Sequence, residues 1–350
     1  AVGFAGLLSR GEVFADRLVA GFSGIRTWPQ LMHIATDGET YGHHHKFGEM
    51  ALAYALDYVS KKGEAVLTNY GEFLDRYPPL HEVQIVENTS WSCFHGIERW
   101  RSDCGCNSGG KPGWNQSWRG PLREALDWLR DELAVIFETK GLDYCSDPWS
   151  VRDHYIDVIL DRSDEAIDRF IAGHADRMAG RKDAIPFLKL MEMERHALLM
   201  YTSCGWFFDE LSGIETVQIL EYAARALQLG EELSGRRLEP RFLERLVRAK
   251  SNIPEIGDGG RLFLKEIKQD MITIEDVAAH YAITSVVKDY PPETGLFCFD
   301  MKNLDFQRLD GGKKALVLGK AAAKSRITKD GADMGFAVLH LGGHTFNGGV

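Results

Sequence analysis

The chain has 350 residues, of which 44% are hydrophobic and 26% are charged, a composition typical of a soluble globular protein with room for about two domains. Its net charge of −10 at pH 7 disfavours nucleic acid and anionic membranes as principal partners, because an acidic surface is repelled by both. No apolar run approaches the ~20 residues that a membrane-spanning helix needs, so we expect no membrane partner.

The most reactive stretch follows a short apolar segment near the amino terminus. Leu31–Ala35 is apolar apart from His33, which is typical of a buried strand in a parallel sheet. The next ten residues, Thr36–His45, contain two acids, two glycines and three consecutive histidines. Because barrels and open α/β sheets hold their chemistry at the carboxyl ends of strands, Asp37 and Glu39 are the first catalytic candidates. An ordinary polar turn is the alternative.

The segments around this stretch have the pattern of βα units. A helix is predicted over residues 4–22, and another from Phe47 to Tyr58 on the spacing of its apolar residues. Ala65–Thr68 is a second strand-like run, and a short helix over residues 70–76 follows it before two prolines.

Residues 90–116 form a segment too irregular for one helix, with three tryptophans and three cysteines, and we predict a long ordered loop. Exposed tryptophan rings can stack on the apolar faces of sugars, which makes Trp91 a candidate for substrate binding. The alternative is that the tryptophans attach the loop to its own core.

The three cysteines and one histidine of this segment lie within fourteen residues, namely Cys93, His95, Cys104 and Cys106. Structural zinc sites usually pair cysteines as Cys-x2–4-Cys, whereas Cys104 and Cys106 have one residue between them. We therefore expect reduced thiols, no bound metal and no cofactor. Six cysteines in 350 residues do not require disulfides, so a cytoplasmic location is expected.

Helical periodicity dominates the centre of the chain. Pro121 opens one predicted helix, Asp147 and Pro148 begin another, and later helices are predicted over residues 163–178, 184–200 and 214–233. Strand-like runs at residues 295–299, 315–318 and 336–341 follow. The expected domains are an α/β region over residues 1–118, a helical bundle over 119–250 and an incomplete β-rich domain over 251–350, with helix predominating.

Three motifs resemble those of the family-57 glycoside hydrolases, retaining enzymes with a seven-stranded (β/α) barrel that act on α-glucans and related sugars. Ala35–His45 resembles the fourth signature motif, and Glu87–Ser92 resembles the fifth, whose Ser-Trp pair lines the sugar site. Met200–Phe208 is similar to a Ser-Asp-Trp-x-Phe helix, with Cys204 and Gly205 replacing the acid. The order resembles a subgroup in which the barrel precedes a region called domain of unknown function 3536.

The resemblance implies that Asp37 is the general acid/base of a retaining glycosidase or glucanotransferase. It also implies substrate contacts for six other residues: Glu39, His43, His44, Ser90, Trp91 and Trp206. The glutamate nucleophile and a His-x-His motif of earlier strands have no match here. We therefore expect the last βα units of a (β/α)7-type barrel, with the nucleophile upstream and the chain inactive by itself.

Two other functions fit the same residues. A metal-dependent hydrolase, such as a sugar deacetylase, would use Asp37, Glu39 and one or more of His43–His45 to bind an ion that activates water. Consecutive histidines cannot all face one ion without a contorted backbone, which weighs against this function. A non-catalytic carbohydrate-binding protein is the third possibility, and the intact Asp37 weighs against it.

Overall fold

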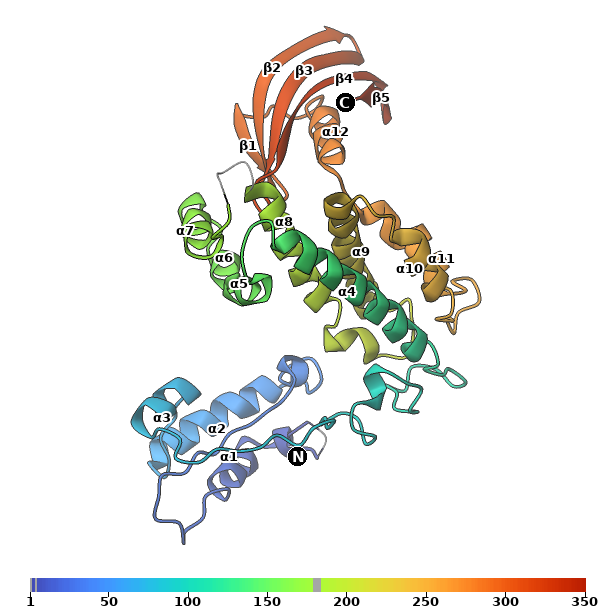
Figure 1. Cartoon of the computed structure of the whole chain (residues 1–350). Coiled ribbons are helices and arrows are strands. Elements are labelled where there is room, and N and C mark those ends of the chain that lie inside the picture. Colours follow the sequence, from blue (N-terminus) through green and yellow to red (C-terminus); the bar gives the residue numbers. More distant parts are fainter. Residues whose placement is uncertain (1, 4, 179–183) are drawn as a thin grey trace. The chain divides into compact units, whose positions relative to one another are not determined.

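The computed structural model describes residues 2, 3, 5–178 and 184–350 (Figure 1). The chain divides into two compact units, residues 1–86 and residues 87–350, and each is described by itself. The fold is mixed α/β, helix predominates, and the described strands form one antiparallel sheet. Among the described helices, none has both the length and the apolar character needed to cross a membrane.

The first unit consists of helices joined by loops. Its elements are η1 (Leu7–Ser9), α1 (Gly11–Val19), η2 (Gly38–Thr40), α2 (Gly48–Lys62) and α3 (Tyr70–Arg76). Phe14 of α1 is fully buried against an apolar face of α2 that includes Ala51, Ala55 and Val59. This small core holds the two helices together. The second helix is confirmed, but of the apolar residues that predicted it Met50 and Tyr54 are exposed.

The barrel strands expected in this unit are not found. Leu31–Ala35 and Ala65–Thr68 have no strand assignment, and the described residues of the unit contain no sheet in which they could pair. A barrel strand exists only through hydrogen bonds to neighbours on both sides. Met32 is 39% exposed, because nothing covers both faces of the segment. The two strand predictions are therefore wrong for this structure, and the barrel units are not confirmed.

The second unit begins with the loop and continues into a set of packed helices. In chain order they are η3 (Glu98–Trp100), α4 (Arg119–Gly141), α5 (Pro148–His154), α6 (Ile156–Leu160), α7 (Asp164–His174), α8 (Ala184–Leu199), η5 (Ser203–Trp206), α9 (Ile214–Ser234) and α10 (Glu239–Leu246). The predicted helices are confirmed here.

The apolar stripe of α4 explains how this core forms. Five of its side chains, three or four residues apart, are fully buried and pack with α8 and α9: Leu122, Leu126, Leu129, Leu133 and Phe137. Local signals set the starts of the shorter helices. Asp147 accepts a hydrogen bond from the amide of Ser150 at 3.1 Å, and Pro148 opens α5, as the sequence predicts.

The last hundred residues are helical before they become β-rich. After α11 (Gly259–Leu262), a π-helical turn (Phe263–Ile267), a 3-10 turn (Lys268–Asp270) and α12 (Ile274–Thr284) come the strands β1 (Glu293–Leu296), β2 (Phe299–Gly311), β3 (Lys314–Ser325), β4 (Gly331–Gly342) and β5 (Thr345–Gly349). The predicted run at residues 295–299 spans the β1–β2 turn, where Phe297 has a φ of 54°.

The sheet is an antiparallel meander with the order β1-β2-β3-β4-β5. Its long strands curve over α12 (Figure 1). Val317, Phe336 and Val338 from the strands form a buried cluster with Tyr281 of α12. The alternation of buried and exposed residues along β3 and β4 is that of a sheet with one covered face.

Helix α8 buries a carboxyl group that has no partner for one of its oxygens. Glu194 is 5% exposed, and its Oε1 accepts no hydrogen bond from a described residue. Burial raises the pKa of Glu194 to about 7 from a usual value near 4.5. The folded state therefore holds this proton to higher pH than the unfolded state. Its stability falls as the pH rises from about 4.5 to about 7, and the penalty remains above that range.

We expect Glu194→Gln, which cannot ionise, to become more stable relative to the parent as the pH rises. The gain between pH 5 and pH 8 should be about 2 kcal/mol in the free energy of unfolding, measured by urea denaturation. Glu165→Gln, at an exposed position on α7, is the control and should show no such gain. The prediction would be contradicted if the free energy of unfolding of Glu194→Gln differed from that of the parent by the same amount at both pH values.

Candidate functional site

The acidic and histidine-rich residues of the first unit form a short exposed loop before α2. Its backbone is held by hydrogen bonds from the amide of Thr40 to the carbonyl of Asp37 at 3.1 Å and from the amide of His44 to the carbonyl of Glu39 at 2.9 Å. The side chains of Asp37, Glu39, His43 and His44 are exposed. The loop thus presents all four predicted residues to solvent.

The three consecutive histidines do not act together. His45 is half-buried, and its Nε2 lies 2.6 Å from the carbonyl oxygen of Gly3, so it fastens the loop to the start of the chain. The exposed rings of His43 and His44 lie 5.4 Å apart between centroids. Among the described residues, the ligating atoms of this loop do not gather at one point. The geometry therefore gives no support to a metal-dependent hydrolase built on it.

The other predicted substrate-binding residues belong to the second unit and differ in accessibility. Trp91 is 74% exposed, as a stacking platform requires. The Ser90 hydroxyl donates to the carbonyl of Gly96 at 2.7 Å, a bond that shapes its own loop.

Trp206 requires a correction, because only 1% of it is exposed and a ring in the core cannot contact a sugar. It stacks on Tyr201 with 6.3 Å between centroids. A Cβ added at Gly205 would lie 2.6 Å from Ile219, so the interrupted segment Tyr201–Phe208 is a close-packed joint between elements of the core. The structure therefore supports a packing role for this segment.

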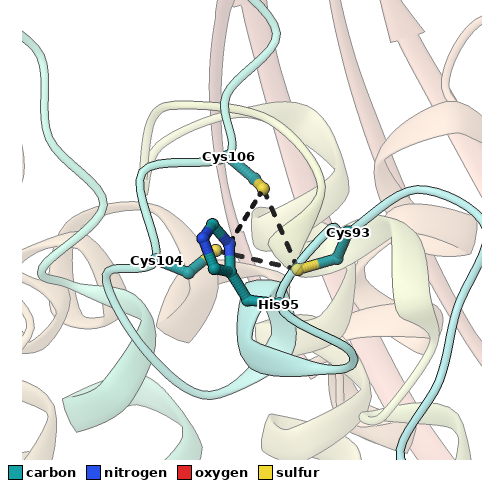
Figure 2. Close-up of side chains that lie close together, drawn as sticks. All are labelled: Cys93, His95, Cys104 and Cys106. Atoms are coloured by element: carbon teal, nitrogen blue, oxygen red, sulfur yellow. Dashed lines mark hydrogen bonds between the residues drawn. The ribbon is translucent and has the colours of Figure 1, made fainter.

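The second unit gathers Cys93, His95, Cys104 and Cys106, whose side chains point toward a common centre (Figure 2). One ligand atom from each lies within 4.8 Å of all the others. The Cys93 sulfur is 3.9 Å from that of Cys104 and 3.8 Å from that of Cys106, and the Cys106 sulfur is 3.6 Å from Nδ1 of His95. The cysteine spacing predicted reduced thiols without a bound metal, and it did not predict that these four side chains meet at one point.

The loop reaches this geometry through a turn between its last two cysteines. Gly105 adopts a φ of +79°, a left-handed conformation that favours glycine and turns the chain between Cys104 and Cys106. The sequence signal was available as two pairs, Cys93-x-His95 and Cys104-x-Cys106, each with one intervening residue. Their spacing alone could not show that the pairs meet.

The environment of Cys93 favours its thiolate. Burial opposes ionisation, but hydrogen bonds from the backbone of Arg99 and His95 and from the other two thiols outweigh it and lower the pKa of Cys93 to about 7. Burial raises the pKa of Cys104. The cluster thus combines a readily ionised thiol with one that ionises only with additional stabilisation.

The loop is attached to the helical core close to the cluster. The Arg99 guanidinium donates to the carbonyl of Phe207 at 2.7 Å, and the Trp100 indole donates to the carbonyl of Ser203 at 2.9 Å. The Asp209 carboxylate accepts from the amides of Ser108 and Gly110, both at 2.8 Å. Arg99, Trp100 and Asp209 therefore attach the loop to the core.

A cavity of about 550 Å³ lies elsewhere in this unit, between α8, α9, the start of α12 and the turns that join β1 to β2 and β3 to β4. In its lining, Lys189 contacts Glu232 at 2.5 Å and Asp330 at 2.8 Å. Burial lowers the pKa of His196 to about 4, so this ring is neutral at pH 7. Acids outnumber the cations Lys189 and Arg225 in its lining, so the cavity is acidic.

Most of the second unit matches a known protein family. No curated protein and no solved structure matches the chain. Residues 114–350 match the family described as domain of unknown function (DUF3536), a match that starts after the Cys/His cluster and includes the helices from α4 onward and the sheet. This match covers more than half of the residues of the chain, and the chain therefore belongs to the DUF3536 family.

Proposed function

We propose that this chain is the carboxyl-terminal part of a retaining glycoside hydrolase or glucanotransferase that acts on α-glucan-like carbohydrate, with Asp37 as the general acid/base. The observation that carries this proposal is an order along the chain: the motif Ala35–His45 comes first, and the DUF3536 region over residues 114–350 follows it. That order resembles the family-57 subgroup in which such a region follows the barrel.

The conformation of the loop is compatible with this role. An acid/base residue must reach the glycosidic oxygen, and Asp37 is exposed and forms no ion pair with a described residue. Its backbone is held at the start of η2, so a bound sugar would meet a carboxyl group in a defined position. His43 and His44 are exposed beside it and could donate hydrogen bonds to sugar hydroxyls.

The chemistry needs two carboxyl groups. In a retaining reaction the first group, a carboxylate, attacks the anomeric carbon while the second, a carboxylic acid, donates a proton to the departing oxygen. The second group then removes a proton from water or an acceptor sugar. Asp37 would be the second group, with Glu39 positioning a histidine or the sugar. The nucleophile would be a glutamate on an earlier strand, as the resemblance implies, and we place it upstream of these residues.

The test is the stereochemistry of α-glucan cleavage by the complete protein that contains this chain. We expect the product to keep the α configuration when it is followed by proton NMR immediately after mixing, and residues 1–350 alone to give no turnover. An inverted product, or activity limited to metal-dependent release of acetate from acetylated sugars, would contradict the proposal. Binding of α-glucans without any turnover would identify a non-catalytic binding protein instead.

A further inference from the structure

We propose that Cys93, His95, Cys104 and Cys106 form a structural zinc site that fastens the loop over residues 90–116 onto the helical part of the second unit. Nothing in this proposal depends on the glycosidase function, because the four residues belong to one compact unit and are identified by their geometry alone.

Three contacts among the four side chains have the distances of tetrahedral coordination, namely those of Cys93 with Cys104, of Cys93 with Cys106 and of Cys106 with His95, and all four ligand atoms lie within 4.8 Å of one another. Zinc bonds of ~2.3 Å to sulfur and ~2.0–2.1 Å to nitrogen, at tetrahedral angles, place two sulfurs ~3.8 Å apart and a sulfur and a nitrogen ~3.6 Å apart. The two sulfur–sulfur distances from Cys93 are 3.8 and 3.9 Å, and Cys106 lies 3.6 Å from the His95 nitrogen. Figure 2 shows the four side chains close together.

The ligand types select the metal and its role. Three thiolates and one imidazole suit zinc, whereas magnesium and calcium prefer oxygen ligands. All four tetrahedral positions would be occupied by protein atoms, which leaves none for a water molecule or a substrate. Closed sites of this kind are structural, and catalytic zinc sites keep one position open. We therefore assign the ion a structural role in the loop.

Two buried guanidinium groups beside the cluster support a net negative charge at its centre. Arg99 is 6% exposed and Arg119 is fully buried, and in each the Nε has no hydrogen-bond partner among the described residues. Within that part of the chain, neither side chain lies within 4 Å of a carboxylate. Three thiolates and a neutral imidazole on a divalent ion leave one negative charge, which would be attracted to these two cations.

Arg119 also links the cluster to the core. Its Nη1 donates to the carbonyl of Cys106 at 2.8 Å, and its Nη2 donates to the carbonyls of Phe207 and Phe208 at 3.3 and 3.2 Å. Outer-shell contacts of this kind orient a ligand-bearing backbone. A metal at the centre would join the two ends of residues 93–106 and hold them against the segment Tyr201–Phe208.

The experiment is elemental analysis of the intact chain, purified without chelators from cells grown in zinc-supplemented medium. We expect about one equivalent of zinc per chain. Replacing zinc with cobalt(II) should produce the intense visible bands of a tetrahedral thiolate site. Cys104→Ser and Cys106→Ser should lose the metal, whereas Cys298→Ser, a cysteine outside the cluster, should retain it.

A chelator experiment on the unsubstituted chain covers the case in which these variants fail to fold. Removing the metal should speed amide hydrogen exchange in residues 93–106 by roughly tenfold or more, and leave α9 unchanged. A folded protein with far less than one equivalent of zinc and no cobalt spectrum would overturn the proposal. So would an iron–sulfur chromophore, a Cys93–Cys104 disulfide in the freshly purified protein, or full metal retention by Cys104→Ser.

Discussion

Asp37→Asn should lower the turnover of the complete enzyme by roughly 10²-fold or more, the usual scale for a proton-transfer group. Its folding and sugar affinity should stay unchanged, because the Asp37 side chain is exposed and does not cap η2. Asparagine keeps the size of the side chain and removes the transferable proton. Turnover and binding would be measured separately, by steady-state kinetics and by calorimetry with an α-glucan oligosaccharide.

Azide should partly restore the activity of Asp37→Asn. A small anion can replace the water that Asp37 would activate, but it cannot protonate a poor leaving group. The rescue should therefore appear only with substrates whose leaving group needs no proton. Asp75→Asn, an exposed acid on α3 of the same unit, is the matched control and should keep normal turnover. Unchanged turnover in Asp37→Asn would remove the acid/base role from this residue.

Glu192→Gln should cause the largest loss of stability, about 3 kcal/mol in the free energy of unfolding at pH 7. Glu192 is 2% exposed and accepts hydrogen bonds from the hydroxyl of Tyr155 at 2.6 Å and from Arg162 at 2.8 Å. Burial opposes its ionisation, but these hydrogen bonds outweigh that effect and hold the pKa of Glu192 below its usual value. The amide would leave the buried Tyr155 and the Arg162 guanidinium without their anionic partner.

The neighbouring Glu194 makes this a matched comparison, because both glutamates are buried on α8 and receive the same substitution. Glu194→Gln should instead stabilise the protein at pH 8, since it removes a buried charge whose Oε1 accepts no hydrogen bond from a described residue. Urea denaturation of both variants would measure the difference. A Glu192→Gln loss below about 0.5 kcal/mol would show that the hydrogen-bonded network contributes no more than exposed ion pairs do.

The helices of the second unit could be predicted because their determinants are local. The apolar stripe of α4 recurs every three or four residues, and Asp147 and Pro148 start α5 through contacts within one turn. Parts of β3 and β4 were predictable for a similar reason, since both strands alternate in burial and are bounded by turn residues such as Gly312 and Lys329, both with positive φ. Most of β2 was not predicted, because its burial does not alternate regularly.

Other features depended on residues far away in the chain. Leu31–Ala35 has the composition of a buried strand, but a strand needs neighbouring strands for its hydrogen bonds, and the described part of the first unit has none. Trp206 has the aromatic character of a sugar platform, yet its packing against Tyr201 places it in the core. Composition alone cannot distinguish an accessible ring from a buried one.

The Cys/His cluster could not be predicted from local sequence. The types of ligand and an ordered loop could be read from the residues, but the spacing of Cys104 and Cys106 argued against a metal. Coordination depends on distances in space, and the loop brings Cys93 and His95 to the same point as the later pair through the turn at Gly105 and the attachment of Arg99 and Trp100 to the core.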